Sequence, residues 1–263
     1  MTHNGPSKDE WDFYFSNVND VLSSLMVNLS AIARAPDRAK PWLLWVWVHM
    51  REPREDGLSS DSEAPTFYKI EDRLAAPLGA ACGAELLGRI TGGRRREFYY
   101  YATTADGFQD AVETAMADFP AYRIDCGKQS DPEWRQYRDV LYPLPKQLRA
   151  IQNRRVLDAL AQRGDDHDIP RIVDHAIYFR SAAQRTAFAS AVEGQGFRIQ
   201  RESKEAQSSE RPFFLNLVRS DQVNSDHINS VVDELVEMAE KLDAEYDGWG
   251  CEVQKKASLS DPI

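Results

Sequence analysis

The chain has 263 residues, of which 42% are hydrophobic and 28% charged, and its formal net charge is −10. This is the composition of a folded globular protein, and the length is sufficient for two domains. An acidic surface repels the phosphate backbone of nucleic acids, so we expect no direct binding to nucleic acid. The charge favours a basic or mixed protein partner, unless it serves solubility alone.

Cysteine spacing and hydropathy indicate in which cellular compartment the protein is expected. The three cysteines, Cys82, Cys126 and Cys251, are widely separated and form no CxxC pair. They predict neither a metal site nor a disulfide framework, and they fit a reducing compartment. Residues 1–6 do not resemble a signal peptide, and the apolar stretch 42–48 is far shorter than a membrane span. We therefore expect a cytoplasmic protein that uses no membrane, metal or cofactor.

The first half of the chain predicts a mixed α+β domain. Alternating or β-branched runs predict strands, and apolar residues at helical spacing predict helices. The expected strands are 11–15, 23–33, 41–50, 84–91, 95–103 and 121–126, and the expected helices are 65–81, 106–118 and 131–142.

A predicted β-hairpin carries the one basic run of the sequence. Gly92-Gly93 separates two strands, as in a tight turn that requires positive φ. Arg94-Arg95-Arg96 follows at once. This run is interpreted either as charge that protects an edge strand or as a contact for an anion or RNA.

The second half of the chain predicts another α+β domain. A helix over 148–162 precedes strands at 171–179, 197–202, 212–219 and 244–253 and helices at 181–193 and 224–242. The order β-α-β-β-α-β thus occurs twice, at 41–126 and 171–253. We predict two tandem ferredoxin-like domains, the first with an extra N-terminal β-hairpin. Pro143 places the boundary, giving domains 1–143 and 144–263.

The second domain has residues that identify a family. They are Pro170-Arg171-Ile172-Val173-Asp174-His175, Tyr178-Phe179, Gly196-Phe197 and the segment Glu245-Tyr246-Asp247-Gly248-Trp249-Gly250. Over about 148–254 the chain resembles RraB, the regulator of ribonuclease E activity B. The resemblance implies a small ferredoxin-like domain without enzymatic activity, which binds ribonuclease E away from its catalytic centre and lowers RNA turnover. The first half resembles an uncharacterised domain found fused ahead of RraB-like domains.

Six residues are candidates for contact with a protein partner: Asp174, His175, Glu245, Tyr246, Asp247 and Trp249. Neighbouring strand residues face opposite sides, so we expect one of Asp174 and His175 inside and the other outside. Gly248 and Gly250 beside Trp249 predict a bulge or a close backbone approach. Trp249 is either an interface anchor, in an acidic surface with Glu245 and Asp247, or a core residue.

The sequence contains no recognisable catalytic motif. GxSxG, HExxH, GxGxxG and a phosphate-binding loop are all missing. Asp165-Asp166-His167-Asp168 has metal-like composition, but adjacent loop residues diverge, so a solvated turn is expected. The function predicted is that of a non-enzymatic regulator that binds a protein, by resemblance ribonuclease E or another RNA-decay component. The alternative is an enzyme or small-molecule sensor with its site in the N-terminal domain.

Overall fold

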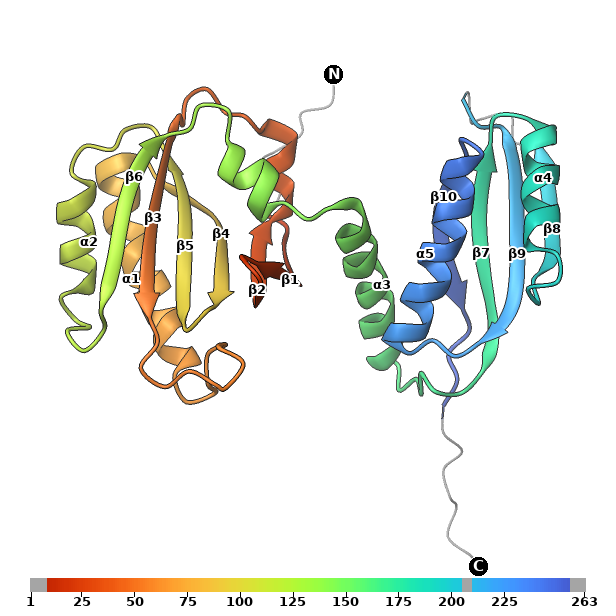
Figure 1. Cartoon of the computed structure of the whole chain (residues 1–263), viewed down its shortest axis with the longest axis horizontal. Helices are drawn as coiled ribbons and strands as arrows, with labels where there is room; N and C mark the ends of the chain where they lie inside the picture. The colour runs from red at the N-terminus through yellow and green to blue at the C-terminus, as the bar shows by residue number, and fades with distance from the viewer. Residues whose placement is uncertain (1–8, 205–209, 256–263) are drawn as a thin grey trace, which may run out of the picture. The chain divides into compact units, whose positions relative to one another are not determined.

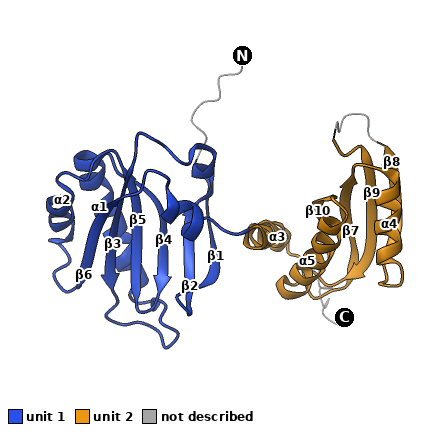
Figure 2. Ribbon diagram, turned by 45° about the horizontal axis from the view of Figure 1, so that its top comes forward, with its two compact units in different colours: residues 1–144 blue, residues 145–263 orange. Residues whose placement is uncertain are grey.

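A computed structural model describes residues 9–204 and 210–255 (Figure 1). The chain divides into two compact units, residues 1–144 and 145–263 (Figure 2). The residues on which the signal-peptide prediction rests, 1–6, lie outside the described residues, as do residues 205–209, between the strands predicted at 197–202 and 212–219. No helix in the described ranges is long and apolar enough to cross a membrane.

The first unit is an antiparallel sheet of six strands with two helices packed against it. The strand order is β1-β2-β4-β5-β3-β6. The strands are β1 (Trp11–Val18), β2 (Val21–Asn28), β3 (Trp42–His49), β4 (Glu85–Gly92), β5 (Arg95–Ala102) and β6 (Ile124–Ser130), and the helices are α1 (Ala64–Cys82) and α2 (Phe108–Met116).

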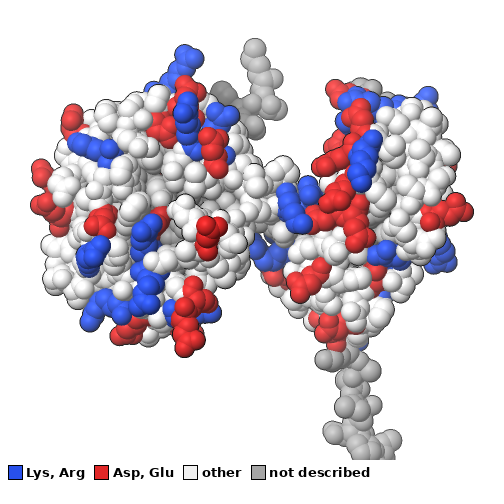
Figure 3. Space-filling view, viewed as in Figure 1, with Lys and Arg blue, Asp and Glu red and all other residues white. Residues whose placement is uncertain are grey.

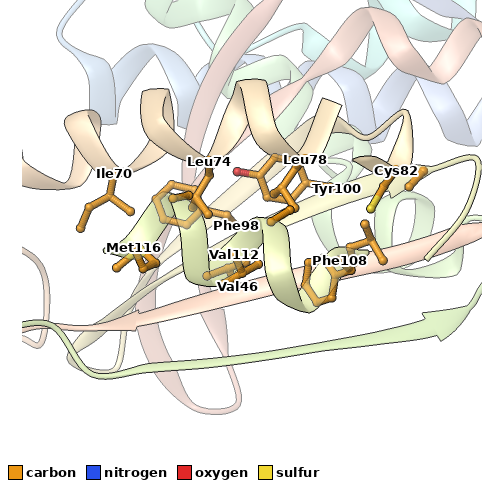
Figure 4. Packing of buried hydrophobic residues seen from close by; sticks show 14 of the residues in the cluster. Val46, Ile70, Leu74, Leu78, Cys82, Phe98, Tyr100, Phe108, Val112 and Met116 are labelled. Atoms are coloured by element: carbon orange, nitrogen blue, oxygen red, sulfur yellow. The ribbon is translucent and has the colours of Figure 1, made fainter. Parts of the chain in front are cut away.

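One core cluster of this unit lies between the sheet and the two helices. Leu74 and Leu78 of α1 and Val112 of α2 meet Val46 and Phe98 of the sheet, as Figure 4 shows, and all five are 0% exposed. The leucines recur four residues apart on α1, which places them on one face of the helix. Burial of such apolar side chains contributes about 1.5–3 kcal/mol each, so this layer fixes the helices on the sheet.

The β4–β5 hairpin confirms the turn predicted at the paired glycines. Gly93 and Arg94 connect the strands with φ of 57° and 64°. Strand β5 nevertheless lies inside the sheet, between β4 and β3. The interpretation of the arginine run as edge protection is therefore wrong, and Arg96 is 5% exposed.

Three segments of the first unit differ from the prediction. The second strand ends at Asn28, and Leu29–Arg34 forms a 3-10 helix (η1), where the Ser30 hydroxyl donates to Asn28 Oδ1 at 2.7 Å. Local bonds of this kind compete with strand pairing. The last strand begins at Ile124 and pairs with β3 as far as Ser130, and the ring of Trp45 lies where a Cβ at residue 127 would stand. The segment predicted as a helix over 131–142 contains only a six-residue π-helix, η2 (Gln136–Leu141).

The second unit is an antiparallel sheet of four strands in the order β10-β7-β9-β8. Both units thus contain β-α-β-β-α-β in the predicted order. The strands are β7 (Arg171–Phe179), β8 (Arg198–Lys204), β9 (Phe213–Asp221) and β10 (Glu245–Cys251), and the helices are α3 (Pro145–Ala161), α4 (Ala182–Val192) and α5 (Ser225–Lys241).

Sequence signals fix the helix starts of this unit. The Ser181 hydroxyl accepts from the Gln184 amide, and the Gln184 side chain accepts from the Ser181 amide, which is a complete capping box. At the start of α5 the Asn224 side chain accepts from the amide of His227, which is a single N-cap bond. Alternate residues of β7 and β9, among them Ile177 and Leu217, are buried with the apolar faces of α4 and α5.

Candidate partner-binding surface

Strand β10 has a bulge at Asp247. Tyr246 pairs with Ile177 and Gly248 pairs with Ala176, so Asp247 has no residue opposite it. Gly248 has φ of 127°, a conformation that L side chains rarely adopt. This confirms the bulge predicted from the glycines. As a result Tyr246 and Trp249, three residues apart, lie on the same face of the sheet, whereas a regular strand would place them on opposite faces.

Tyr246 is held by a buried histidine. The Tyr246 hydroxyl and His175 Nδ1 share a hydrogen bond of 2.8 Å, and His175 is 0% exposed. Burial lowers the pKa of His175 to about 4 and raises the pKa of Tyr246. At neutral pH both groups are therefore uncharged, and the pair positions β10 on β7.

Trp249 is tied to the helices by a chain of polar contacts. Its indole Nε1 donates to Asn153 Oδ1 at 2.8 Å, and Asn153 Nδ2 donates to Asn229 Oδ1 at 2.7 Å. Asn153 is on α3 and 5% exposed, and Asn229 is on α5. The indole thus has its polar end satisfied while part of its ring stays accessible.

Complementary charges also join α3 to α5. Lys146 and Arg149 of α3 both approach Asp233 of α5, at 2.9 and 3.3 Å. Acidic side chains gather over α5 on the face that Figure 3 shows, and its sequence has five carboxylates, at positions 226, 233, 234, 237 and 240. The basic helix α3 therefore lies against an acidic neighbour.

A hollow of about 380 Å³ opens beside Trp249, bounded by α3, α5 and β10. It combines apolar walls with polar and charged groups at its mouth. Its lining consists of Arg149, Gln152, Asn153, Val156, Val232, Tyr246, Asp247, Gly248 and Trp249. Because β10 pairs with β7 alone, its outer edge adjoins the hollow without a neighbouring strand among the described residues. This volume is at the lower end of the range that binds a small group in proteins.

The six predicted contact residues do not form one surface. Tyr246, Asp247 and Trp249 line the hollow. Asp174 and Glu245 are on the opposite face of the sheet, where Asp174 Oδ1 accepts from Asn216 at 3.5 Å and Glu245 lies 3.5 Å from Arg211. An acidic surface that joins Glu245 to Trp249 is thus a wrong prediction, since the pleat separates them.

His175 is also misplaced as a contact residue. It is the inward member of the Asp174–His175 pair, as strand alternation predicts, and its complete burial prevents contact with a partner. Its part is to position Tyr246.

The aspartate-rich loop 165–168 is not the solvated turn that the sequence suggests. The Asp165 side chain is 0% exposed and forms an ion pair with Arg171, whose side chain is 2% exposed. Asp165 Oδ2 also accepts from the amide of Gln254 at 2.7 Å. The loop therefore fastens the residues after β10 to the start of β7. Among described residues no group of three or more potential ligands could hold a metal ion.

Among the lining residues that the sequence-based prediction did not include, Arg149 and Asn153 make the polar contacts of the hollow. Both are on α3, a helix whose apolar pattern is weak. The sequence did contain an indication of this contact, because Asn153 is a polar residue between the buried positions Ile151 and Leu157. Buried polar residues are normally hydrogen-bonded, so Asn153 indicates a specific contact.

Comparison with family models assigns both units. Residues 9–142 match the family of unknown function DUF695, and residues 150–251 match regulator of ribonuclease activity B, RraB. A search of the curated proteins found no match.

Similar solved structures add little. An unknown protein from Galdieria sulphuraria is 12% identical, with a TM-score of 0.23, over 81% of this chain and 99% of that one. A putative glycine cleavage system transcriptional repressor is 10% identical, with a TM-score of 0.22, over 80% and 98%. Neither likeness carries an argument at such TM-scores. The family models are decisive: the chain belongs to the DUF695 family through its first unit, and its second unit matches the RraB family of regulators.

Proposed function

We propose that this protein is a non-enzymatic regulator whose second unit binds a protein partner, namely ribonuclease E or another component of RNA decay. The match of residues 150–251 to RraB supports this class of function. The observation that carries the site is the hollow beside Trp249. It offers a partly accessible indole, whose Nε1 is already bonded, next to the free edge of β10.

The chemistry of the hollow supports an anchored protein contact. Trp249 and Val156 supply rigid apolar area, and tryptophan is among the residues that dominate binding energy at interfaces. Asp247 is largely exposed at the mouth, and the partial burial of its carboxyl, together with the nearby Glu245, raises its pKa. A partner side chain with an apolar stem and a cationic end, such as lysine or arginine, would match both features.

The fold and the cellular location that we propose agree with this function. We propose that both units follow the ferredoxin-like plan, with β1–β2 added to the first, and that each folds as a separate domain. The three cysteines are free, which supports a cytoplasmic location. We propose no direct contact with nucleic acid, because the proposed partner is a protein.

The test measures binding of the full chain to purified ribonuclease E of the same organism, together with the rate at which the ribonuclease cleaves an RNA substrate. A double variant, Gln152→Arg with Asp247→Arg, places two long cations at the mouth of the hollow. We expect it to bind at least about tenfold more weakly and to lose inhibition in proportion.

A matched control carries the same change of charge elsewhere. Gln162→Arg with Glu237→Arg alters exposed positions that do not line the hollow, and it should bind like the unmodified protein. Equal affinity of the two double variants would move the interface away from the hollow. No binding by the unmodified chain would reject ribonuclease E as the partner.

A further inference from the structure

A second hollow, of about 320 Å³, lies in the first unit where the β1–β2 hairpin extends the sheet. The strand register explains its floor. Phe15 pairs with Ser24, Ser24 with Thr91, and Thr91 with Arg96, so one row of side chains crosses four strands on the same face.

A parallel row begins at Phe13 and passes through Met26 to Arg89. Tyr68 of α1 and the loop before that helix, with Arg54 and Ser59, also line the hollow. Three arginines and three aromatic rings thus surround one space.

Arg96 is the unusual member of this set. Its residue is 5% exposed, its Nε donates to Thr91 Oγ1 at 3.0 Å and its Nη2 donates to Ser59 Oγ at 3.4 Å. Its Nη1 is buried and has no hydrogen-bond partner within the described ranges. A buried guanidinium that lacks an anion is costly, because both its charge and its donors lose water.

The other two arginines are already neutralised. Arg89 forms an ion pair with Glu71, and Arg54 Nη2 lies 2.7 Å from Asp56 Oδ2. The faces of Phe67 and Tyr68 lie 4.9 and 5.3 Å from the Arg96 guanidinium and offset part of its cost. The Tyr68 hydroxyl also interacts with the guanidinium, but no atom of the described residues accepts a hydrogen bond from Nη1. Among the described residues at the hollow, three guanidinium groups are thus balanced by two carboxylates, Asp56 and Glu71, and Glu71 acts on both Arg89 and Arg96.

Burial and the nearby Arg89 lower the pKa of Arg96 to about 10, against smaller raising effects of Tyr68 and Glu71. The group nevertheless remains charged at neutral pH. An anion in the hollow would supply the missing acceptor and the missing charge together.

We propose that this hollow binds a small oxyanion, a carboxylate or a phosphate, that carries a compact apolar group. The oxyanion accepts from Arg96 Nη1, and the apolar group rests between Phe13, Phe15 and Tyr68. The DUF695 unit is thus a ligand-binding module, and this site is separate from the hollow beside Trp249.

The test titrates the full chain with phenyl phosphate, benzoate, inorganic phosphate and, as an uncharged probe, benzyl alcohol, by isothermal calorimetry. We expect one site per chain for phenyl phosphate or benzoate, whichever oxyanion is preferred, and weaker binding of inorganic phosphate and benzyl alcohol. Arg96→Gln should lower the affinity for the preferred probe at least about tenfold, because one charged hydrogen bond is lost. Arg94→Gln, a neighbour in the same basic run that does not line the hollow, should leave it unchanged.

Phe15→Ala keeps the test valid if Arg96→Gln does not fold. Phe15 is 53% exposed, so its removal leaves the core intact. The Phe15→Ala variant should have a several-fold lower affinity for phenyl phosphate or benzoate and an unchanged affinity for inorganic phosphate. The proposal is overturned if neither aromatic oxyanion binds at about 10 mM, if benzyl alcohol binds as well as they do, or if the preferred probe binds the folded variants as it binds the unmodified chain.

Discussion

Acidification is expected to destabilise the second unit through one residue, His175. Its Nδ1 is bonded to the Tyr246 hydroxyl, its Nε2 is buried without a partner among the described residues, and the charged groups that affect its pKa are Asp221 and Arg219. Burial dominates and places the pKa at about 4 in the fold, against 6.5 for an ordinary histidine.

The sign and size of the effect follow from proton linkage. Because the unfolded chain binds the proton more tightly, the stability that neutral His175 contributes is complete above about pH 7 and is lost as the pH falls towards 4. Between pH 7 and pH 5 the free energy of unfolding should fall by about 2 kcal/mol from this residue. The effect levels off below about pH 3, where the group is protonated in both the folded and the unfolded chain.

The assay is urea unfolding of the full chain at pH 7 and at pH 5, read by a pulse of deuterium exchange at a common pH. Peptides from β7 and α5 report on the second unit, and peptides from β3 and β5 serve as an internal control. His175→Gln should be less stable at pH 7, but it should lose the part of the pH dependence that His175 supplies. An equal pH dependence in the variant and the unmodified protein would refute the argument.

Three further perturbations test other parts of the structure. Gly248→Ala should destabilise the second unit by about 1–3 kcal/mol through backbone strain alone, since a methyl group there meets no atom within 4 Å; an unchanged urea midpoint would exclude the positive φ. Tyr101→Phe removes the hydroxyl that donates to Asp131 Oδ2 at 2.5 Å and should cost the first unit about 1–3 kcal/mol in urea unfolding; no loss would show that this bond is not formed. Residues 144–263 should unfold cooperatively as an isolated fragment, because Phe179, Phe188, Val232 and Leu235 are buried within that unit; a fragment without a cooperative thermal transition would contradict the boundary.

Local patterns predicted the elements whose signals are strongest. The helices predicted at 181–193 and 224–242 and the strand predicted at 171–179 agree with α4, α5 and β7 to within one residue at each end. The segment 29–34 was predicted wrongly because its side chains bond locally near Asn28 rather than pair with a strand. Strand propensity alone does not detect such competition.

The candidate site was predicted only in part, because its residues come together through tertiary contacts. The bulge at Asp247 was readable from Gly248 and Gly250, but the side of the sheet on which Glu245 lies depends on register. Asn153 meets Trp249 across 96 residues of sequence. The arginine run illustrates the same limit, since only the strand order β4-β5-β3 shows that Arg96 is interior.

The most direct test of the proposed function is a footprint of the complex between the full chain and ribonuclease E. Hydrogen exchange of the backbone amides, compared with and without the ribonuclease, locates the contact by peptide. We predict slower exchange in peptides that cover residues 149–156 of α3 and 245–251 of β10, and unchanged exchange in β8 and in the strands of the first unit. Protection confined to β8, β9 or the first unit would contradict the proposed surface, and unchanged exchange throughout would contradict the partner.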